Sequence, residues 1–365
     1  MAVTSNTALR ITELDFDGIK NNLKNYLRSQ SEFQDYDFEG SGMSVLLDVL
    51  AYNTHYMGYY LNMVGNEMFM DTAQLRSSIL SHAKNINYLP GSKRGAKTLV
   101  NVLVTPSNSE DNVATSLVLS KYSNFLGEDI DGINYNFVTT DSTTVGVVAN
   151  TATFTNVAIK QGQPATISFV VDSTENPKYL FELPQPNVDT STIKVLVQES
   201  SSNGTTTTYT QASNYLTLDS SSTVYFLQEG IGGLFQIYFG DDILGKKLKN
   251  GNIVIVSYVV TQGTAAADAN NFVLMNTISG YSNVTVQSVT SATQGSEKES
   301  IASIKFQAPK SYSAQNRAVT KEDYITAIQQ NKEGYPLEAV SVWGGEQNDP
   351  PVYGQVFIAI KPTGG

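Results

Sequence analysis

The sequence predicts an α+β, multidomain fold: an N-terminal helical bundle segment, β-rich middle domains and a C-terminal α+β block. Three observations predict it. Apolar residues recur at helical spacing through the first 89 residues, β-type runs with Gly and Asn turns fill the middle, and helix and strand patterns return after Gly295. The expected parts are 1–89, 97–172, 187–290 and 295–365.

Composition excludes several classes of protein. The chain has no cysteine, which rules out disulfides and thiolate metal sites. It carries 23 basic and 34 acidic residues, a net charge of −11, and an acidic surface repels phosphates. We therefore expect no nucleic-acid binding. The first ten residues are polar and show no signal-peptide pattern.

Residues 15–30 have the spacing of an ordinary amphipathic helix. The basic residues Lys20, Lys24 and Arg28 lie away from its apolar stripe. That stripe consists of Phe16, Ile19, Leu23, Tyr26 and Leu27.

Residues 41–64 predict a helix that is apolar over most of its circumference. Polar residues recur every seven positions as a narrow strip, at Ser41, Asp48, His55 and Asn62. These residues and Asn53 interrupt every window long enough to span a membrane, so no membrane insertion is expected. Either this helix is the centre of a small local bundle, or helices of neighbouring subunits complete its covering. Composition alone leaves both open.

The two histidines lie on predicted helices. His82 shares the apolar face of residues 74–88, where a histidine is usually a hydrogen-bonded packing residue. For His55 we expect an interhelical hydrogen bond. The basic, turn-rich stretch 90–97 that follows favours a solvated hinge or a contact for an acidic neighbouring subunit.

The middle of the chain reads as short strands separated by turns. A Pro-rich break at 172–186 is the expected boundary inside this region. The polar tract 200–210 predicts a hairpin tip, or a segment that only a partner orders. The expected strands cover 99–105, 116–119, 135–139, 151–160, 165–171, 192–199, 215–218, 224–227, 235–239, 253–260 and 285–289.

Two acidic groups in this region resemble chemical sites and are better explained as turns. The stretch 128–132 lacks the third acid of a calcium loop, and the loop's twelfth position is Thr140 rather than Glu. Asp241 and Asp242 are adjacent in a turn, whereas a glycosidase pair needs opposed carboxylates. The chain also lacks a G-x-S-x-G, Walker or H-E-x-x-H motif. We expect no catalytic residue, cofactor or metal.

The last seventy residues predict two helices followed by two strands. Ser296 and Glu299 have capping-box spacing, and Pro309 is expected to end that helix near Ala308. Thr320 and Asp323 form a second box-like start. Strand-like runs follow at 337–343 and 353–360.

These residues also carry a family resemblance. The segments 315–324 (Gln-Asn-Arg-Ala-Val-Thr-Lys-Glu-Asp-Tyr), 342–345 (Val-Trp-Gly-Gly) and 238–247 (Tyr-Phe-Gly-Asp-Asp-Ile-Leu-Gly-Lys-Lys) are long and in order. With them the chain resembles the baseplate J-like family of contractile phage tails, and within it the wedge subunits that form the inner ring in T-even-type phages. The resemblance spans nearly the whole chain, including 86–97. Wedge ring proteins of this kind continue well beyond the position of Gly365. Either the sequence is therefore part of a longer product, or the C-terminal ring-contacting portion is absent.

The resemblance implies a structural virion protein of the tail baseplate, assembled in the host cytoplasm. Its implied partners are sister copies (a dimer within a wedge, a ring in the baseplate), a second larger wedge subunit and a small lysozyme-like sheath-initiator subunit. The helices would join an intersubunit bundle, the β units would act as rigid spacers, and the last block would close a ring that rearranges when the sheath contracts. The expected interface residues are Val45, Val49, Tyr52, Tyr56, Tyr59, Tyr60, Met63, Arg317, Tyr324 and Trp343.

Two other functions stay open. The Tyr-, Asn- and Ser-rich β-structure is compatible with a receptor- or glycan-binding tail protein, although a fibre would show repeats and none occurs. A glycan-cleaving enzyme is the third hypothesis.

Overall fold

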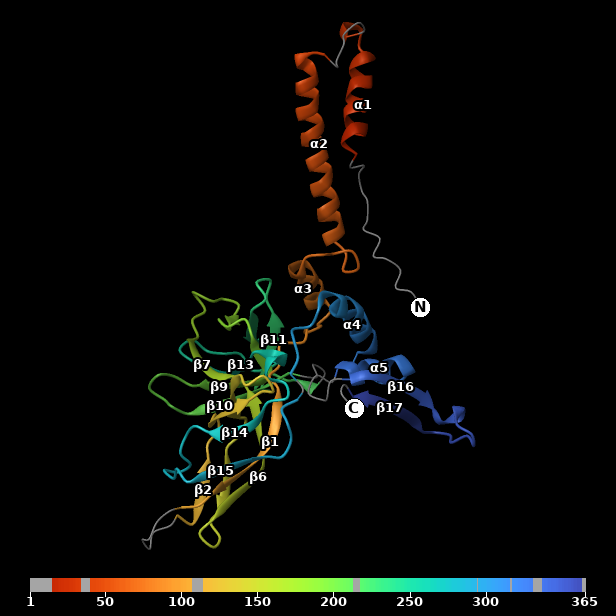
Figure 1. Cartoon of the computed structure of the whole chain (residues 1–365). Helices are drawn as coiled ribbons and strands as arrows, with labels where there is room; N and C mark the ends of the chain where they lie inside the picture. Colours follow the sequence, from red (N-terminus) through yellow and green to blue (C-terminus); the bar gives the residue numbers. More distant parts are fainter. Residues whose placement is uncertain are drawn as a thin grey trace. The chain divides into compact units, whose positions relative to one another are not determined.

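The computed structural model describes residues 15–33, 40–106, 114–212, 217–293, 295–315, 317–330 and 337–362. It divides the chain into two compact units, Met1–Ile86 and Asn87–Gly365. The described part of the first unit is helical, and the second combines sheets with two further helices (Figure 1). The chain is therefore an α+β, multidomain protein, as the sequence predicts.

The helical unit contains the three predicted helices. Helix α1 (Phe16–Arg28) begins at Asp15, whose carboxylate accepts a hydrogen bond from the Gly18 N–H at 3.0 Å. A short 3-10 turn, η1 (Ser31–Phe33), follows it. Helix α2 (Gly42–Glu67) packs against α1 (Figure 1), and α3 (Arg76–Asn85) completes the unit.

The packed side of α1 includes two lysines beside the half-buried Phe16, Ile19, Leu23 and Leu27 of the predicted apolar stripe. Lys20 forms a 2.5 Å ion pair with Asp48 of α2, and Lys24, one turn later, is buried. Tyr26, expected in the apolar stripe, is exposed. The prediction that the lysines lie away from the packed side was wrong because the strip of α2 that α1 meets is polar.

His82 of α3 is hydrogen-bonded, as predicted. Its Nε2 lies 2.9 Å from the carbonyl oxygen of Glu67, the last residue of α2. The Glu67 carboxylate in turn accepts hydrogen bonds from the N–H groups of Gln74 and Leu75. These contacts close the connection between α2 and α3.

The second unit contains a six-stranded antiparallel sheet in the order β14-β3-β4-β6-β1-β15. Its strands are β1 (Lys97–Val104), β3 (Asn124–Glu128), β4 (Asn134–Thr139), β6 (Ala152–Gln161), β14 (Asn270–Leu274) and β15 (Val284–Ser288). A two-stranded ribbon of β2 (Ser116–Leu119) and β5 (Thr143–Gly146) accompanies it. Alternate residues of β1 are buried, and Phe125, Phe137 and Phe154 fill the core with them.

A seven-stranded sheet follows in the order β7-β13-β9-β10-β11-β12-β8, with β10 and β11 parallel. Its strands are β7 (Gln163–Val170), β8 (Phe181–Glu182), β9 (Val188–Gln198), β10 (Thr206–Gln211), β11 (Val224–Glu229), β12 (Phe235–Phe239) and β13 (Ile253–Val260). Phe235, Ile237, Val254 and Tyr258 lie at its core. A 3-10 turn, η3 (Gly263–Ala266), leads back toward β14.

The sheets divide the chain elsewhere than the predicted ranges 97–172 and 187–290. Strand β7 pairs with β13 over its whole length, whereas β14 and β15 return to the first sheet. The break at 172–186 is therefore a connection inside the second sheet. The chain changes sheets at Gly162, where φ is 140° and an added Cβ would lie 2.5 Å from the Val260 carbonyl oxygen. A long antiparallel ladder decides sheet membership, and a local Pro-rich break does not.

The loops give mixed outcomes. The polar tract forms a hairpin tip at 199–205, followed by β10, which pairs with β9. The predicted strand 215–218 lies partly outside the described residues, and Thr217 and Leu218 are not in a strand.

The predicted solvated hinge at 90–97 is wrong: Ser92, Gly95 and Ala96 are buried, and Arg94 and Lys97 form β-bridges. Its backbone pairs with Thr293 and Ser296.

The C-terminal block has the predicted order of helices and strands. Helix α4 (Ile301–Ala314) begins at Ser300, whose hydroxyl accepts from the Ser303 N–H, and not at Ser296. It also runs through Pro309, since Ile304, Ala308 and Ala314 on either side are buried and offset the lost hydrogen bond. Helix α5 (Lys321–Gln330) is followed by β16 (Leu337–Gly344), the 3-10 turn η4 (Gly345–Gln347) and β17 (Val356–Pro362).

The second predicted capping box is confirmed. The Asp323 N–H donates to the Thr320 hydroxyl, and the Asp323 carboxylate accepts from the Thr320 N–H at 2.9 Å. Hydrogen bonds from the N–H groups of Thr320 and Val319 hold the pKa of Asp323 below its ordinary value. This box begins α5, which packs on β16.

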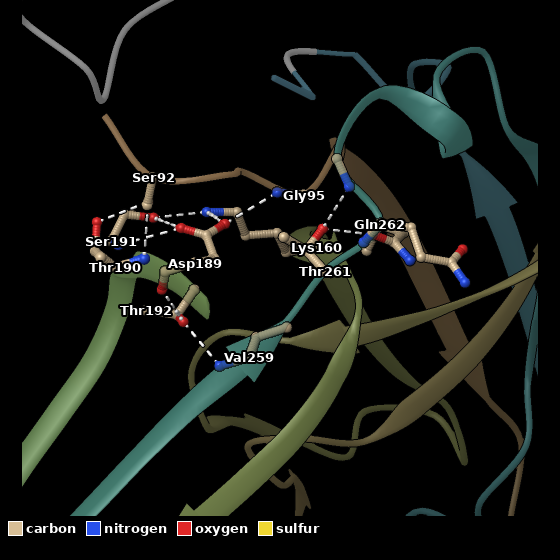
Figure 2. A network of polar contacts seen from close by, with 12 residues as sticks. Ser92, Gly95, Lys160, Asp189, Thr190, Ser191, Thr192, Val259, Thr261 and Gln262 are labelled. Carbon is tan, nitrogen blue, oxygen red and sulfur yellow. Dashed lines mark hydrogen bonds and ion pairs between the residues drawn. The ribbon is translucent and has the colours of Figure 1, made fainter. Parts of the chain in front are cut away.

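A buried polar network ties the two large sheets together (Figure 2). Asp189, fully buried at a bulge of β9, forms a 2.6 Å ion pair with Lys160 near the end of β6. Its carboxylate also accepts from the Gly95 N–H at 3.0 Å and from Ser191. The adjacent Thr192 accepts from the Val259 N–H. A charge buried this deeply is tolerated because every contact is a charge-assisted or hydrogen-bonded one.

Removing a carboxylate from this network should lower the free energy of unfolding more than removing an exposed carboxylate elsewhere. Asp189→Ala should lower the free energy of unfolding by about 3–5 kcal/mol, because Lys160 and the Gly95 N–H lose a buried partner. The control is Glu338→Ala, which removes an exposed ion pair with Lys361 and should cost about 0–1 kcal/mol. Urea unfolding followed by circular dichroism measures both. Equal losses would contradict the role given to Asp189.

Candidate protein–protein interface

Helix α2 exposes its apolar residues to solvent in the described chain. They lie between 40% and 65% exposed, whereas Leu47 and Ala51 are buried. The group comprises Val45, Leu46, Val49, Leu50, Tyr52, Tyr56, Met57, Tyr59, Tyr60, Leu61, Met63 and Val64, with Met68 just after the helix. A contiguous apolar surface of this kind is typical of an interaction site.

The polar strip of α2 is the packed side. Asn62 is buried, Asp48 and His55 are half-buried, and Asp48 holds Lys20 of α1. The His55 Nδ1 is buried without a hydrogen-bond partner among the described residues, so this atom does not make the predicted interhelical bond. The unit thus packs its polar strip inward and turns its apolar side outward, the reverse of an ordinary amphipathic helix.

One half of the exposed surface is an aromatic stripe: Val45, Val49, Tyr52, Tyr56, Tyr59 and Met63. Its steps of four and three residues match the heptad of a left-handed coiled coil. The Tyr52 and Tyr56 hydroxyls lie 2.7 Å apart, with ring centroids at 4.5 Å in an edge-to-face arrangement. The hydrogen bond with Tyr52 raises the pKa of Tyr56 above its ordinary value.

The other half is an aliphatic stripe: Leu46, Leu50, Asn53, Met57, Leu61, Val64 and Met68. Its steps run 4-3-4-4-3-4, an eleven-residue repeat that favours straight or slightly right-handed helix pairs. The exposed Asn53 is its polar member, and one such residue in an apolar seam fixes register. Tyr60 lies between the two stripes.

The width of the exposed surface indicates how many helices would cover it. At about 100° per residue, the exposed residues span about 200° of the α2 circumference. An apolar stripe that faces one core is about 100° wide, and α1 already occupies the polar side. Two further helices would therefore be needed.

The predicted C-terminal site residues differ in exposure. Arg317 is exposed and donates to the Gln315 side chain at 3.0 Å. Tyr324 is half-buried on α5. Trp343 is half-buried, stacks on Phe357 and donates from Nε1 to Asn348 at 2.8 Å, so it holds its own hairpin together.

Sequence reasoning selected the aromatic stripe and Tyr60 but left the aliphatic stripe out of the interface. Continuing the helical spacing beyond Val64 to Met68 would have revealed it. It also missed the exposed apolar row Val356, Ile358 and Ile360 on β17, which alternates as a strand face does.

The described residues lack both a metal-binding cluster and a membrane-spanning helix. They contain no group of three His, Asp or Glu side chains placed to hold a metal ion. No helix in this part of the chain is long and apolar enough to cross a membrane.

Comparisons with known proteins match both ends of the chain. Residues 15–88 match the family model "Baseplate wedge protein gp6-like, helical domain", and residues 320–365 match "Baseplate structural protein gp6, C-terminal domain I". The chain is also similar to the baseplate wedge protein gp6 of Enterobacteria phage T4, at 29% identity over 377 residues. This covers 96% of the chain and 54% of the T4 protein, so the chain spans about half the length of that relative.

The chain is also similar to a solved baseplate structure. This is the six-fold symmetrised cryo-EM structure of the anti-feeding prophage baseplate, at 12% identity, with 98% of this chain and 72% of that chain covered. The TM-score of 0.34 is too low to carry an argument. The matches support the baseplate wedge proteins as relatives, and the baseplate J-like name stays a prediction.

Adjacent leucines of α2 provide a matched test of which side is packed inside the chain. Leu47→Ala should destabilise the helical unit by about 2 kcal/mol or more, because Leu47 is 2% exposed. Leu46→Ala should stay within about 0.5 kcal/mol, because Leu46 is 58% exposed. Hydrogen exchange of α1 and α2 amides, at concentrations where the chain is monomeric, measures both. A larger loss for Leu46→Ala would show that the assignment of sides is wrong.

Proposed function

We propose that this chain is a structural subunit of the wedge of a contractile phage tail baseplate, located in the virion. The observation that carries the proposal is the outward apolar surface of α2, which lies inside the segment 15–88 that matches a baseplate wedge helical domain. The T4 relative, named a baseplate wedge protein, aligns with nearly the whole chain.

In this proposal the helical unit joins a helical bundle between subunits. Two neighbouring helices would cover the aromatic and the aliphatic stripe, and their different periods suit two different packings. Sister copies within a wedge and a second, larger wedge subunit are the proposed sources of these helices. The small lysozyme-like sheath-initiator subunit is a further proposed partner.

The C-terminal block would make the lateral contacts of the ring around the tail hub. The alternating apolar row on β17 supports this role, because Val356, Ile358 and Ile360 are 44–49% exposed on a two-stranded ribbon. Helix α5 packs on β16, and the apolar row that stays exposed on β17 would gain from an additional neighbour. Arg317 and Tyr324 belong to the same block and complete the proposed surface.

The apolar character of the two α2 stripes suits a ring that rearranges when the sheath contracts. The described residues of the two α2 stripes are uncharged, so their contacts are non-directional and can re-form in a shifted position. The role is mechanical and non-enzymatic. The alternative, a glycan-binding tail protein, has less support, because the tyrosines 52, 56, 59 and 60 gather on a helix rather than on a sheet.

Charge substitutions in the full chain test the proposal. Val49→Lys with Tyr56→Lys alters the aromatic stripe, and Leu50→Lys with Met57→Lys alters the aliphatic stripe. Each pair should weaken assembly with sister copies or the neighbouring wedge subunits by at least about tenfold, because a buried, unpaired ammonium is costly. Native mass spectrometry of the chain alone and with those subunits measures the stoichiometry.

The matched control is Asn21→Lys with Asn22→Lys, on the exposed side of α1. It adds the same charge and should leave assembly unchanged. If both stripe variants assemble with unaltered stoichiometry, the wedge-bundle role is wrong. If the chain binds host-cell glycans while isolated, the alternative function gains support.

A further inference from the structure

The chain enters and leaves its β region through one short antiparallel pair, here named the neck: residues 88–97 and the described residues of 293–300, which leave out 294. Arg94 and Ser296 exchange both backbone hydrogen bonds, at 2.9 and 3.0 Å, and so do Lys97 and Thr293, at 2.8 and 2.9 Å. Everything from 98 to 292 lies between these two crossings along the chain. The entering segment follows the helical unit directly, and the leaving segment leads directly into α4.

Glu299 closes the end of the neck at which both segments continue to helices. Its N–H donates to the Gly91 carbonyl at 2.9 Å, and its carboxylate accepts from the Gly91 N–H at 2.6 Å. The same carboxylate accepts from the Tyr88 hydroxyl and from Ser303 in the first turn of α4, both at 2.7 Å. Burial and the Glu299 charge raise the pKa of Tyr88 far above its ordinary value, so Tyr88 remains a donor. One side chain thus joins the entering segment, the leaving segment and α4.

Both segments of the neck are also fixed to the sheets. Gly95 donates to the buried Asp189, which also holds Lys160 of the first sheet (Figure 2). Lys298 forms a 2.8 Å ion pair with the buried Glu229 of β11 and donates to the Gly233 carbonyl at 2.6 Å. An added Cβ at Gly95 would lie 2.2 Å from the Gln161 carbonyl oxygen, so the backbone of the neck packs directly against the first sheet at this residue.

We propose that the neck is the mechanical connection between the helical unit and the C-terminal block, that Glu299 is its latch, and that the β region is a side branch. A pull applied between α3 and α4 then acts on the neck first and reaches the sheets only after the neck has opened. This arrangement replaces the predicted rigid spacers: the β units do not stand in series between the two ends. The inference concerns the isolated chain and does not rest on the baseplate role.

Single-molecule pulling on the full chain tests this inference. Handles attach through Lys84→Cys in α3 and Lys310→Cys in α4, and the absence of native cysteine keeps the attachment specific. Glu299→Ala should lower the force at which residues 98–292 begin to extend to about half of its original value or less. It should also speed hydrogen exchange at Gly91 and Glu299 at least about tenfold, because three side-chain hydrogen bonds and the paired backbone are released.

Glu297→Ala is the matched control, since Glu297 is on the same neck and forms an ion pair with Lys93 but is more than half exposed. It should leave the opening force within the experimental scatter. Urea unfolding of the β region should be unchanged in both variants, which separates a latch from a general loss of stability. An opening force that is equal in the Glu299 and Glu297 variants overturns the proposal. A fall in the urea midpoint that accounts for the lower force also overturns it.

Discussion

The constraint on which the helical part of this protein depends is the placement of polar and apolar residues around α2. The Lys20–Asp48 ion pair and the polar strip join α1 to α2, so the apolar arc is left outside. Burying one Leu, Val or Met side chain contributes about 1.5–3 kcal/mol. The exposed arc therefore holds a large unused driving force for association, and no described residue of the unit uses it. A helical hairpin packed through its polar side is a component of a larger bundle.

In the β region, by contrast, the important polar contacts are made within the chain. Its buried carboxylates are paired inside the chain, Asp189 with Lys160 and Glu229 with Lys298. The half-buried Glu299 accepts hydrogen bonds from the entering segment of the neck and from α4. Such contacts are directional and tolerate little displacement. The chain thus combines a rigid node, where both sheets, the neck and α4 meet, with a helical surface whose contacts are apolar and adjustable. That division suits a subunit whose neighbours move while its own fold stays intact.

Local pattern predicted the helices well, and long-range pairing explains most of the errors. Spacing located α2, and the Thr320–Asp323 box located the start of α5, because both signals lie within a few residues. Sheet membership depends on ladders such as β7 with β13, about ninety residues apart in sequence, which no local signal encodes. The predictions for Lys24, Ser296 and Pro309 were wrong because contacts with residues distant in the sequence outweighed the local helix signals. For the interface, periodicity identified the aromatic stripe, and the same spacing continued to Met68 would have identified the aliphatic stripe. The structure adds that α1 packs on the polar side of α2 and leaves both stripes exposed.

Hydroxyl-radical footprinting tests the central claim most directly, by comparing the isolated chain with the assembled tail. The reporters are the tyrosines of the aromatic stripe and the methionines Met57, Met63 and Met68, with the exposed Met275 of the β region as an internal reference for dose. The account predicts rapid modification of the α2 reporters in the isolated chain and strong protection in the assembly. Equal modification rates in the two states would show that other subunits do not cover the apolar arc, and the account would be wrong.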